Sequence, residues 1–144
     1  MRVDFYQLSE IPVEGALPAL AAKMREAGAK VLVVSADDAQ LARISEALWA
    51  PRGTFLAHGV AGSPEEARQP ILLSDNIAAP NDANFLALAD GQWRSGAEGF
   101  ERVFLLFDNS TIDDARATWR SLDGLDEIER NYWQQKDKGW VKAA

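Results

Sequence analysis

The chain contains no cysteine, only one histidine and no long hydrophobic run. The lack of cysteine excludes disulfides, thiolate metal ligands and thiol nucleophiles. The first residues lack the basic start, apolar stretch and cleavage site of a signal peptide. No apolar segment approaches the roughly 20 residues that a membrane span needs. These absences predict a cytoplasmic protein with no membrane-spanning segment.

A surplus of basic residues is also missing, since 22 acidic residues outnumber 15 basic ones and the net charge is −7. The field of such a chain repels a phosphate backbone, so we expect no direct binding to DNA. An acidic chain that binds an acidic peptide must gather its few cations at one place. Any such cluster of arginine or lysine is therefore a candidate binding site.

The length of 144 residues, with 47% hydrophobic and 26% charged residues, predicts a single globular domain over 1–144. Short β-branched or aromatic runs that suit strands alternate with stripes of apolar residues at helical spacing. The expected strands are 3–8, 30–34, 54–57, 71–74, 85–89 and 102–107, and the expected helices are 17–28, 35–49 and 111–122, with a loop over 59–69.

The alternation of strands and helices predicts an α/β fold, a three-layer α/β/α sandwich with an open, mainly parallel sheet of Rossmann-like topology. The tail departs from this alternation. Two short strands, 131–135 and 140–142, flank a turn at 136–139 that contains Gly139. We expect a C-terminal hairpin over about 130–142.

Aspartates follow two of the expected strands, where open α/β sheets place their ligands. Asp37, Asp38 and Asp108 are thus candidates for a nucleotide- or metal-dependent enzyme, which is the alternative function. Helix capping explains them more simply, with Ser35 as the expected cap of the second helix and both Asp37 and Asp38 in its first turn. The segment before the first helix has one glycine, Gly15, and therefore no phosphate-binding loop.

His58 is the one histidine, and no acid and nucleophile accompany it in a recognisable pattern. We therefore expect a structural role for His58 rather than general base catalysis. The five tryptophans, several at the ends of elements, favour a binding module over an enzyme.

The second expected helix ends in an ALW triplet, and F-x-x-H-x-x-A-G follows over 55–62. This specific combination resembles the chi subunit family of the bacterial DNA polymerase III clamp-loader complex. The likeness covers most of residues 2–122. The segments that carry it are 30–34 (KVLVV), 46–49 (EALW), 55–62 (FLAHGVAG), 100–103 (FERV) and 114–120 (DARATWR).

The resemblance implies a non-catalytic adaptor without a cofactor. Chi proteins link the clamp loader, through the psi subunit, to the acidic C-terminal tail of the single-stranded DNA-binding protein SSB, which ends in Pro-Phe. The resemblance places psi against Trp49 and Phe55, although both rings would equally serve to seal the sheet. A helicase that uses this surface in place of psi is a further possibility.

For the SSB tail, the resemblance implies Arg116, Trp119 and Arg120, with Phe107 lining the apolar part of the pocket. Positions 116, 119 and 120 share one helix face, and two guanidiniums beside an indole suit an acidic peptide with an aromatic end. The alternative is a solvated arginine face beside a core tryptophan.

Two features depart from the family pattern. Ile112 replaces a basic residue of some chi proteins, which removes one charge from the expected tail site. The hairpin extends past the similar region, and its Arg130, Lys136 and Lys138 are candidates to restore positive charge there.

Overall fold

The computed structural model describes residues 1–50, 56–136 and 139–144, and the eight strands in these ranges form one sheet. The strand order is β3-β4-β2-β5-β6-β1-β7-β8, and every neighbouring pair is parallel except β7 and β8. The predicted α/β class with a mainly parallel sheet is therefore confirmed. The strands are β1 (Arg2–Gln7), β2 (Val31–Val34), β3 (Gly59–Val60), β4 (Ile71–Ser74), β5 (Phe85–Leu88), β6 (Arg102–Phe107), β7 (Glu129–Lys136) and β8 (Gly139–Lys142).

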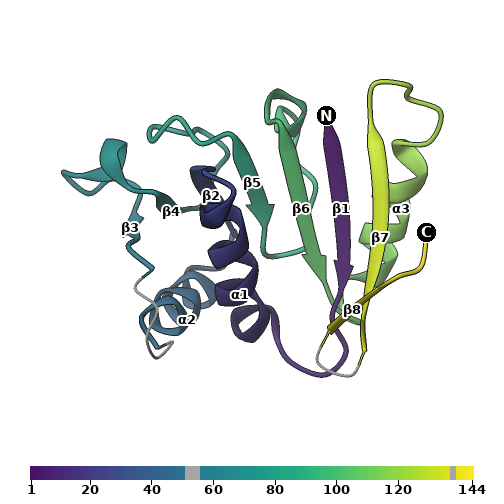
Figure 1. Ribbon diagram of the computed structural model, residues 1–144, viewed down its shortest axis with the longest axis horizontal. Coiled ribbons are helices and arrows are strands. Elements are labelled where there is room, and N and C mark those ends of the chain that lie inside the picture. The colour runs from purple at the N-terminus through teal and green to yellow at the C-terminus, as the bar shows by residue number, and fades with distance from the viewer. Residues whose placement is uncertain (51–55, 137–138) are drawn as a thin grey trace.

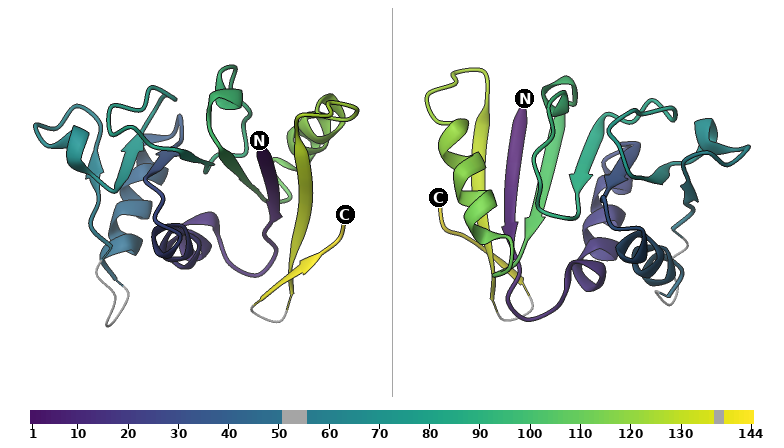
Figure 2. Two further views of the ribbon diagram at one scale, coloured as in Figure 1. Left: turned by 45° about the horizontal axis from the view of Figure 1, so that its top comes forward. Right: turned by 180° about the vertical axis from the view of Figure 1, so that it is seen from behind.

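Helices cover both faces of the sheet, as the alternation of elements predicted. Figure 1 shows α1 (Val13–Glu26) and α2 (Asp38–Trp49) on the near face, and α3 (Ile112–Ser121) behind β1 and β7. The view from behind in Figure 2 places α3 in front of these strands. Two short 3₁₀ turns, Glu66–Arg68 and Ala97–Gly99, lie in the connections.

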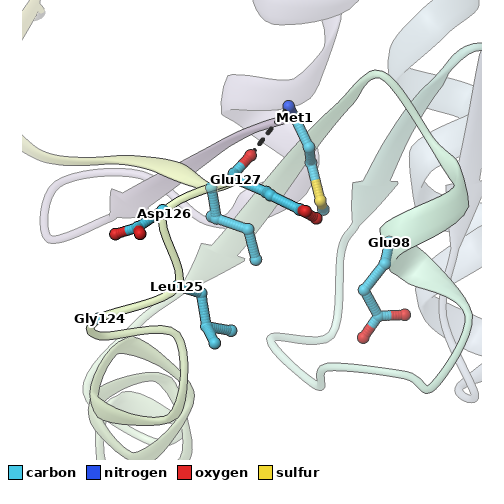
Figure 3. Close-up of a pocket in the computed structure, with 7 residues that line it drawn as sticks. Met1, Glu98, Gly124, Leu125, Asp126 and Glu127 are labelled. Carbon is cyan, nitrogen blue, oxygen red and sulfur yellow. Dashed lines mark hydrogen bonds between the residues drawn. The ribbon is translucent and has the colours of Figure 1, made fainter.

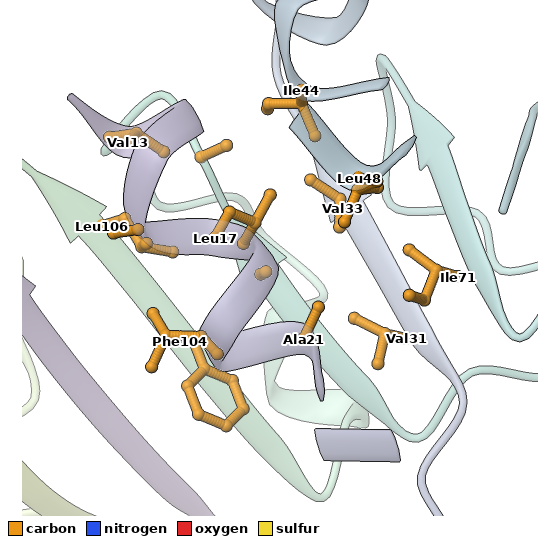
Figure 4. Packing of buried hydrophobic residues seen from close by; sticks show 14 of the residues in the cluster. Val13, Leu17, Ala21, Val31, Val33, Ile44, Leu48, Ile71, Phe104 and Leu106 are labelled. Atoms are coloured by element: carbon orange, nitrogen blue, oxygen red, sulfur yellow. The ribbon is translucent and has the colours of Figure 1, made fainter. Parts of the chain in front are cut away.

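The near face is packed largely by aliphatic side chains beneath α1 and α2. Figure 4 shows Leu17 and Ala21 of α1 against Val31 and Val33 of β2, with Ile44 of α2 beside them. The strands beneath are buried on both faces and carry no alternation of polar residues, as parallel central strands require. We call β2, β4 and β5 with α1 and α2 the aliphatic half.

The ends of the first two helices follow from local residues. Gly28 takes a φ of +81° after α1, which lets the Ala29 N–H donate to the Met24 carbonyl at 3.1 Å and end the helix. Asp37, not Ser35, caps α2, because its side chain accepts from the Ala39 N–H at 2.9 Å. The predicted cap at Ser35 is wrong: its hydroxyl instead accepts from the Asp37 N–H at 3.1 Å.

The predicted strand over 54–57 is also wrong where the structure describes it. Leu56 and Ala57 have no strand partner, whereas Thr54 and Phe55 lie outside the described residues. The Leu56 carbonyl bonds to the His58 ring, Nδ1 to oxygen at 3.0 Å, instead of joining the sheet. The strand at this edge is β3, inside the segment predicted as a loop.

The C-terminal hairpin is confirmed, and it extends the main sheet. β7 begins at Glu129 and runs parallel to β1, and β8 returns antiparallel along β7. In Figure 1 none of the described helices lies over the near face of β1 and β7. We call β1, β7 and β8 with α3 the aromatic half.

An ion-pair network holds the near face of the aromatic half. The carboxylate of Asp4 is fully buried and accepts from Arg102 Nε at 2.8 Å and from Trp133 Nε1 at 3.0 Å. Arg2 lies 3.2 Å from the same carboxylate. Tyr6 stacks on the Trp133 ring, with 6.3 Å between centroids, and so extends the network into an aromatic layer.

Gln135 of β7 fastens the hairpin to the loop that follows β1. Its Oε1 atom accepts from three consecutive backbone N–H groups, those of Ser9, Glu10 and Ile11, at 3.2, 2.9 and 3.3 Å. Successive N–H groups that converge in this way form a concave site for an acceptor. The side chain of Gln135 fills that site and ties the last strands to the first.

Candidate functional site

A pocket of about 340 Å³ lies between α3 and β7, and it contains the three α3 residues that the sequence singled out. Arg116, Trp119 and Arg120 all line it, in agreement with their spacing on one helix face. Ala144 lines the same pocket, together with three polar side chains from β1 and β7. We call this the α3–β7 pocket, and its lining residues are Gln7, Arg116, Trp119, Arg120, Tyr132, Gln134 and Ala144.

Aromatic contacts fix the walls of the α3–β7 pocket. The Trp119 ring meets Phe5 and Tyr132 edge to face, with centroids 5.1 and 5.7 Å apart. Phe107 packs against Tyr132 at 5.7 Å, is 1% exposed and lies outside the set that lines the pocket. The rings are therefore held by one another, and Phe107 supports Tyr132 from beneath.

The hydroxyl of Tyr132 points along the pocket toward β1. It donates to Gln7 Oε1 at 2.7 Å. Burial raises the pKa of Tyr132, and the nearby charge of Arg116 partly opposes that rise. The phenol therefore stays neutral near pH 7 and offers hydrogen bonding without negative charge.

Two positive charges at this pocket have no partner within the described part of the chain. Arg116 and Arg120 are exposed, and neither makes a hydrogen bond or ion pair to the described residues, unlike the other described arginines. An exposed guanidinium presents a planar fork of donors that fits a carboxylate. The convergence of cations that an acidic chain requires is therefore present here.

The hairpin residues that were candidates for added charge lie differently. The Arg130 guanidinium stacks over the Trp119 ring at 4.1 Å and donates to the Trp119 carbonyl at 2.6 Å. It also pairs with Asp123 at 3.0 Å, so its charge is engaged at the end of α3. Lys136 does not line the pocket, and Lys138 lies outside the described residues. Ile112, half-buried, packs on the core at the start of α3.

The second predicted surface lies at the other end of the molecule. Trp49 ends α2 with 54% of its surface exposed, and its ring lies 4.4 Å from the His58 ring. His58 is buried, and its Nε2 lies 2.8 Å from Ser45 Oγ. His58 thus joins α2 to the segment after it and supports Trp49, a structural arrangement. Its predicted companion Phe55 lies outside the described residues.

Comparison with protein families shows to which family this chain belongs. The family described as DNA polymerase III chi subunit, HolC, matches residues 1–127. The chain belongs to the chi family. A search of curated proteins gives no match to the chain.

Membership in the chi family makes the protein a non-catalytic accessory subunit of the DNA polymerase III holoenzyme. The matched region includes Trp49 and all of α3, whereas β7 and β8 lie beyond it. Three of the seven residues that line the α3–β7 pocket, Tyr132, Gln134 and Ala144, therefore lie outside the family match. None of the described helices combines the length and hydropathy that crossing a bilayer requires.

The three aspartates that suggested a nucleotide- or metal-dependent enzyme do not all lie together in this fold. Asp37 and Asp108 line one crevice of about 200 Å³, and Asp38 does not. Each has a local role: Asp37 caps α2, and Asp108 accepts from the Ser110 N–H at 2.9 Å. Within the described ranges, no three acidic or histidine side chains gather as a metal site. Capping therefore accounts for Asp37, whereas Asp108 stabilises the turn before α3 and Asp38 lies in the first turn of α2.

An acidic pocket of about 540 Å³ lies at the amino-terminal ends of β1 and β7, and no sequence motif predicted it. Figure 3 shows Glu98 and Asp126 around this hollow, with Leu125 exposed between them. The N-terminal amine of Met1 donates to the Glu127 carbonyl at 3.2 Å. The carboxylates of this pocket give it a charge opposite to that of the α3–β7 pocket, where Arg116 and Arg120 lie.

The residues of the α3–β7 pocket that sequence reasoning missed are Gln7, Tyr132, Gln134 and Ala144. Tyr132 and Gln134 alternate with Trp133 and Gln135 in the predicted strand, so the pattern shows that they share a face. Which face meets α3 depends on the parallel pairing of β7 with β1. No local signal reports that pairing.

Proposed function

We propose that this chi-family protein is a replisome adaptor that links the clamp loader, through psi, to the acidic C-terminal tail of SSB. The observation that carries the proposal is a pair of guanidiniums, Arg116 and Arg120, that have no partner among the described residues and lie beside Trp119 at the α3–β7 pocket. The positive charges suit the acidic residues of the tail, and the aromatic walls suit its terminal phenylalanine. Such a subunit acts in the cytoplasm, beside replicating DNA.

The Trp49 surface is proposed as the psi-binding side, with Phe55 as its second aromatic residue. An exposed tryptophan at a helix end is typical of the anchors that fill a partner's pocket. The support from His58 limits the freedom of the ring before binding, which lowers the entropy lost on association. The two proposed surfaces lie at opposite ends of the sheet, so both partners have room to bind at once (Figure 1).

The proposal for the tail is tested by fluorescence anisotropy with a labelled acidic peptide that ends in Pro-Phe. The matched control is the same peptide without its terminal phenylalanine, and both are titrated at low and moderate salt. We expect saturable binding that needs the phenylalanine and weakens with salt, because exposed charge pairs are screened. Equal affinity for the two peptides, or no binding, would refute the proposed role of the pocket.

A further inference from the structure

The residues that follow β8 return to the α3–β7 pocket. β8 pairs with β7 from Lys136 back to Trp133, where Lys142 lies opposite. Beyond Lys142 the backbone continues along the same edge: the Ala143 N–H donates to the Tyr132 carbonyl at 2.8 Å, and the Tyr132 N–H donates to the Ala144 carbonyl at 3.0 Å. Ala144 thereby becomes one wall of the pocket.

To the part of the chain that the structure describes, this returning segment is joined by backbone hydrogen bonds and by no side-chain hydrogen bond. Ala143 and Ala144 are both exposed, and each side chain is a single methyl group. An exposed backbone hydrogen bond adds little net stability, since water replaces it readily. The segment therefore covers the backbone of Tyr132 without a side-chain anchor.

The edge that the segment covers suits an extended peptide. Residues 129–131 of β7 lie past the end of β8 and have no described strand on that side. An added strand gains main-chain hydrogen bonds from such an edge, while pockets beside it select side chains. Arg116, Arg120 and Trp119 stand beside Tyr132 at this edge.

We propose that residues 143–144 hold the strand position of an incoming acidic peptide, which binds by displacing them and pairing with the backbone of Tyr132. The inference rests on the proposed function of the α3–β7 pocket and adds the mode of binding. The peptide replaces both backbone bonds and adds ion pairs and aromatic contacts that two alanines do not make. The peptide binds only molecules in which this edge is uncovered. The apparent Kd for the peptide is therefore the intrinsic Kd divided by the uncovered fraction.

The test compares the wild-type chain with a chain that ends at Lys142 and with Ala143→Pro, which lacks the N–H donor. The control is Val141→Ala, an exposed change on β8 that leaves the contacts of Tyr132 in place. The probe is the labelled acidic peptide that ends in Pro-Phe. We expect the Kd to fall about tenfold for the shortened chain, less for Ala143→Pro, and to stay unchanged for Val141→Ala. An unchanged or higher Kd for the shortened chain overturns the inference.

Hydrogen exchange on the wild-type chain separates this inference from the proposed function. We expect the peptide to speed exchange at the Ala143 amide, which loses its acceptor, while the Tyr132 amide stays protected. If the peptide binds and the Ala143 amide keeps its protection, the displacement is wrong and the tail site stands. If the peptide binds none of the chains, the proposed function and the inference both fail.

Discussion

The aliphatic and aromatic halves of the sheet are stabilised in different ways. In the first, α1 and α2 bury residues such as Leu17 and Ile44 on strands that are apolar on both faces. In the second, rings pack on rings, and the buried carboxylate of Asp4 joins β1 to β6 and β7 through Arg102 and Trp133. The first half is packed mainly by aliphatic side chains, whereas the second adds aromatic packing and buried polar contacts to its hydrophobic core.

The two halves also present different surfaces. The aliphatic half ends in Trp49, which projects from α2 and suits a partner with a hollow of its own. The aromatic half forms a pocket, because Trp119 and Tyr132 meet edge to face and leave space beside them. One fold thus presents a projecting tryptophan at one end and a pocket lined by two exposed arginines at the other.

The largest expected effect comes from breaking the polar contacts of the aromatic half. Asp4→Ala leaves Arg102, Arg2 and the Trp133 N–H without their shared acceptor, so we expect a loss of about 3 kcal/mol in the free energy of unfolding. Urea denaturation measures it, with the exposed Asp126→Ala as control. A loss similar to that of the control would mean that the rings alone hold this half.

Alkaline pH provides a milder way to weaken the same half. Burial raises the pKa of Tyr6 from 10.0 to about 12, with Asp4 adding to the rise. Because the pKa of Tyr6 is higher in the folded state, the neutral hydroxyl contributes stability that is fully present below about pH 10. This contribution to the free energy of unfolding is lost as the pH rises toward 12. We expect a fall of about 2 kcal/mol over that range.

The control for alkaline pH is Tyr6→Phe, which has no hydroxyl to ionise. Tyr132 and the lysines titrate in both proteins. Their contribution therefore cancels when the free energy of unfolding of Tyr6→Phe is subtracted from that of the wild-type protein. Chemical denaturation at pH 9, 10, 11 and 12 gives the two curves. Parallel curves would contradict the assigned burial of the Tyr6 hydroxyl.

A smaller effect is expected where the hairpin is fastened to the rest of the sheet. Gln135→Ala removes the acceptor of three backbone N–H groups, but these groups are exposed and water replaces it. We therefore expect a loss of only about 1 kcal/mol. The matched control is the neighbouring Gln134→Ala, which faces the α3–β7 pocket. Thermal unfolding that ranks Gln134→Ala as the more damaging change would refute the role of Gln135.

Local patterns in the sequence predict most of the aliphatic half. Apolar spacing predicts α1 and α2, and the KVLVV run predicts a central strand that is buried on both faces. The two wrong predictions in this half also concern local hydrogen bonds. Asp37, rather than Ser35, caps α2, and the Leu56 carbonyl bonds to the His58 ring rather than to a neighbouring strand. Small differences between alternative hydrogen-bond partners decide such details.

The aromatic half is less predictable because its contacts join distant residues. The spacing of Arg116, Trp119 and Arg120 predicts a shared face, and the structure places all three at one pocket. The opposite wall needs Gln7 beside Tyr132, and these two residues are 125 positions apart in the chain. Their meeting depends on β7 pairing with β1, and sequence periodicity carries no information on strand order.

The central proposal is that the protein has two separate protein-binding surfaces. The most direct test titrates one peptide against a variant of each surface. The labelled acidic peptide that ends in Pro-Phe is titrated against Arg116→Ala and Trp49→Ala, after thermal unfolding shows that both are folded. We predict that Arg116→Ala raises the Kd at least tenfold, since it loses a charge-assisted contact, and that Trp49→Ala leaves the Kd unchanged. Normal binding by Arg116→Ala, or weakened binding by Trp49→Ala, would contradict the account.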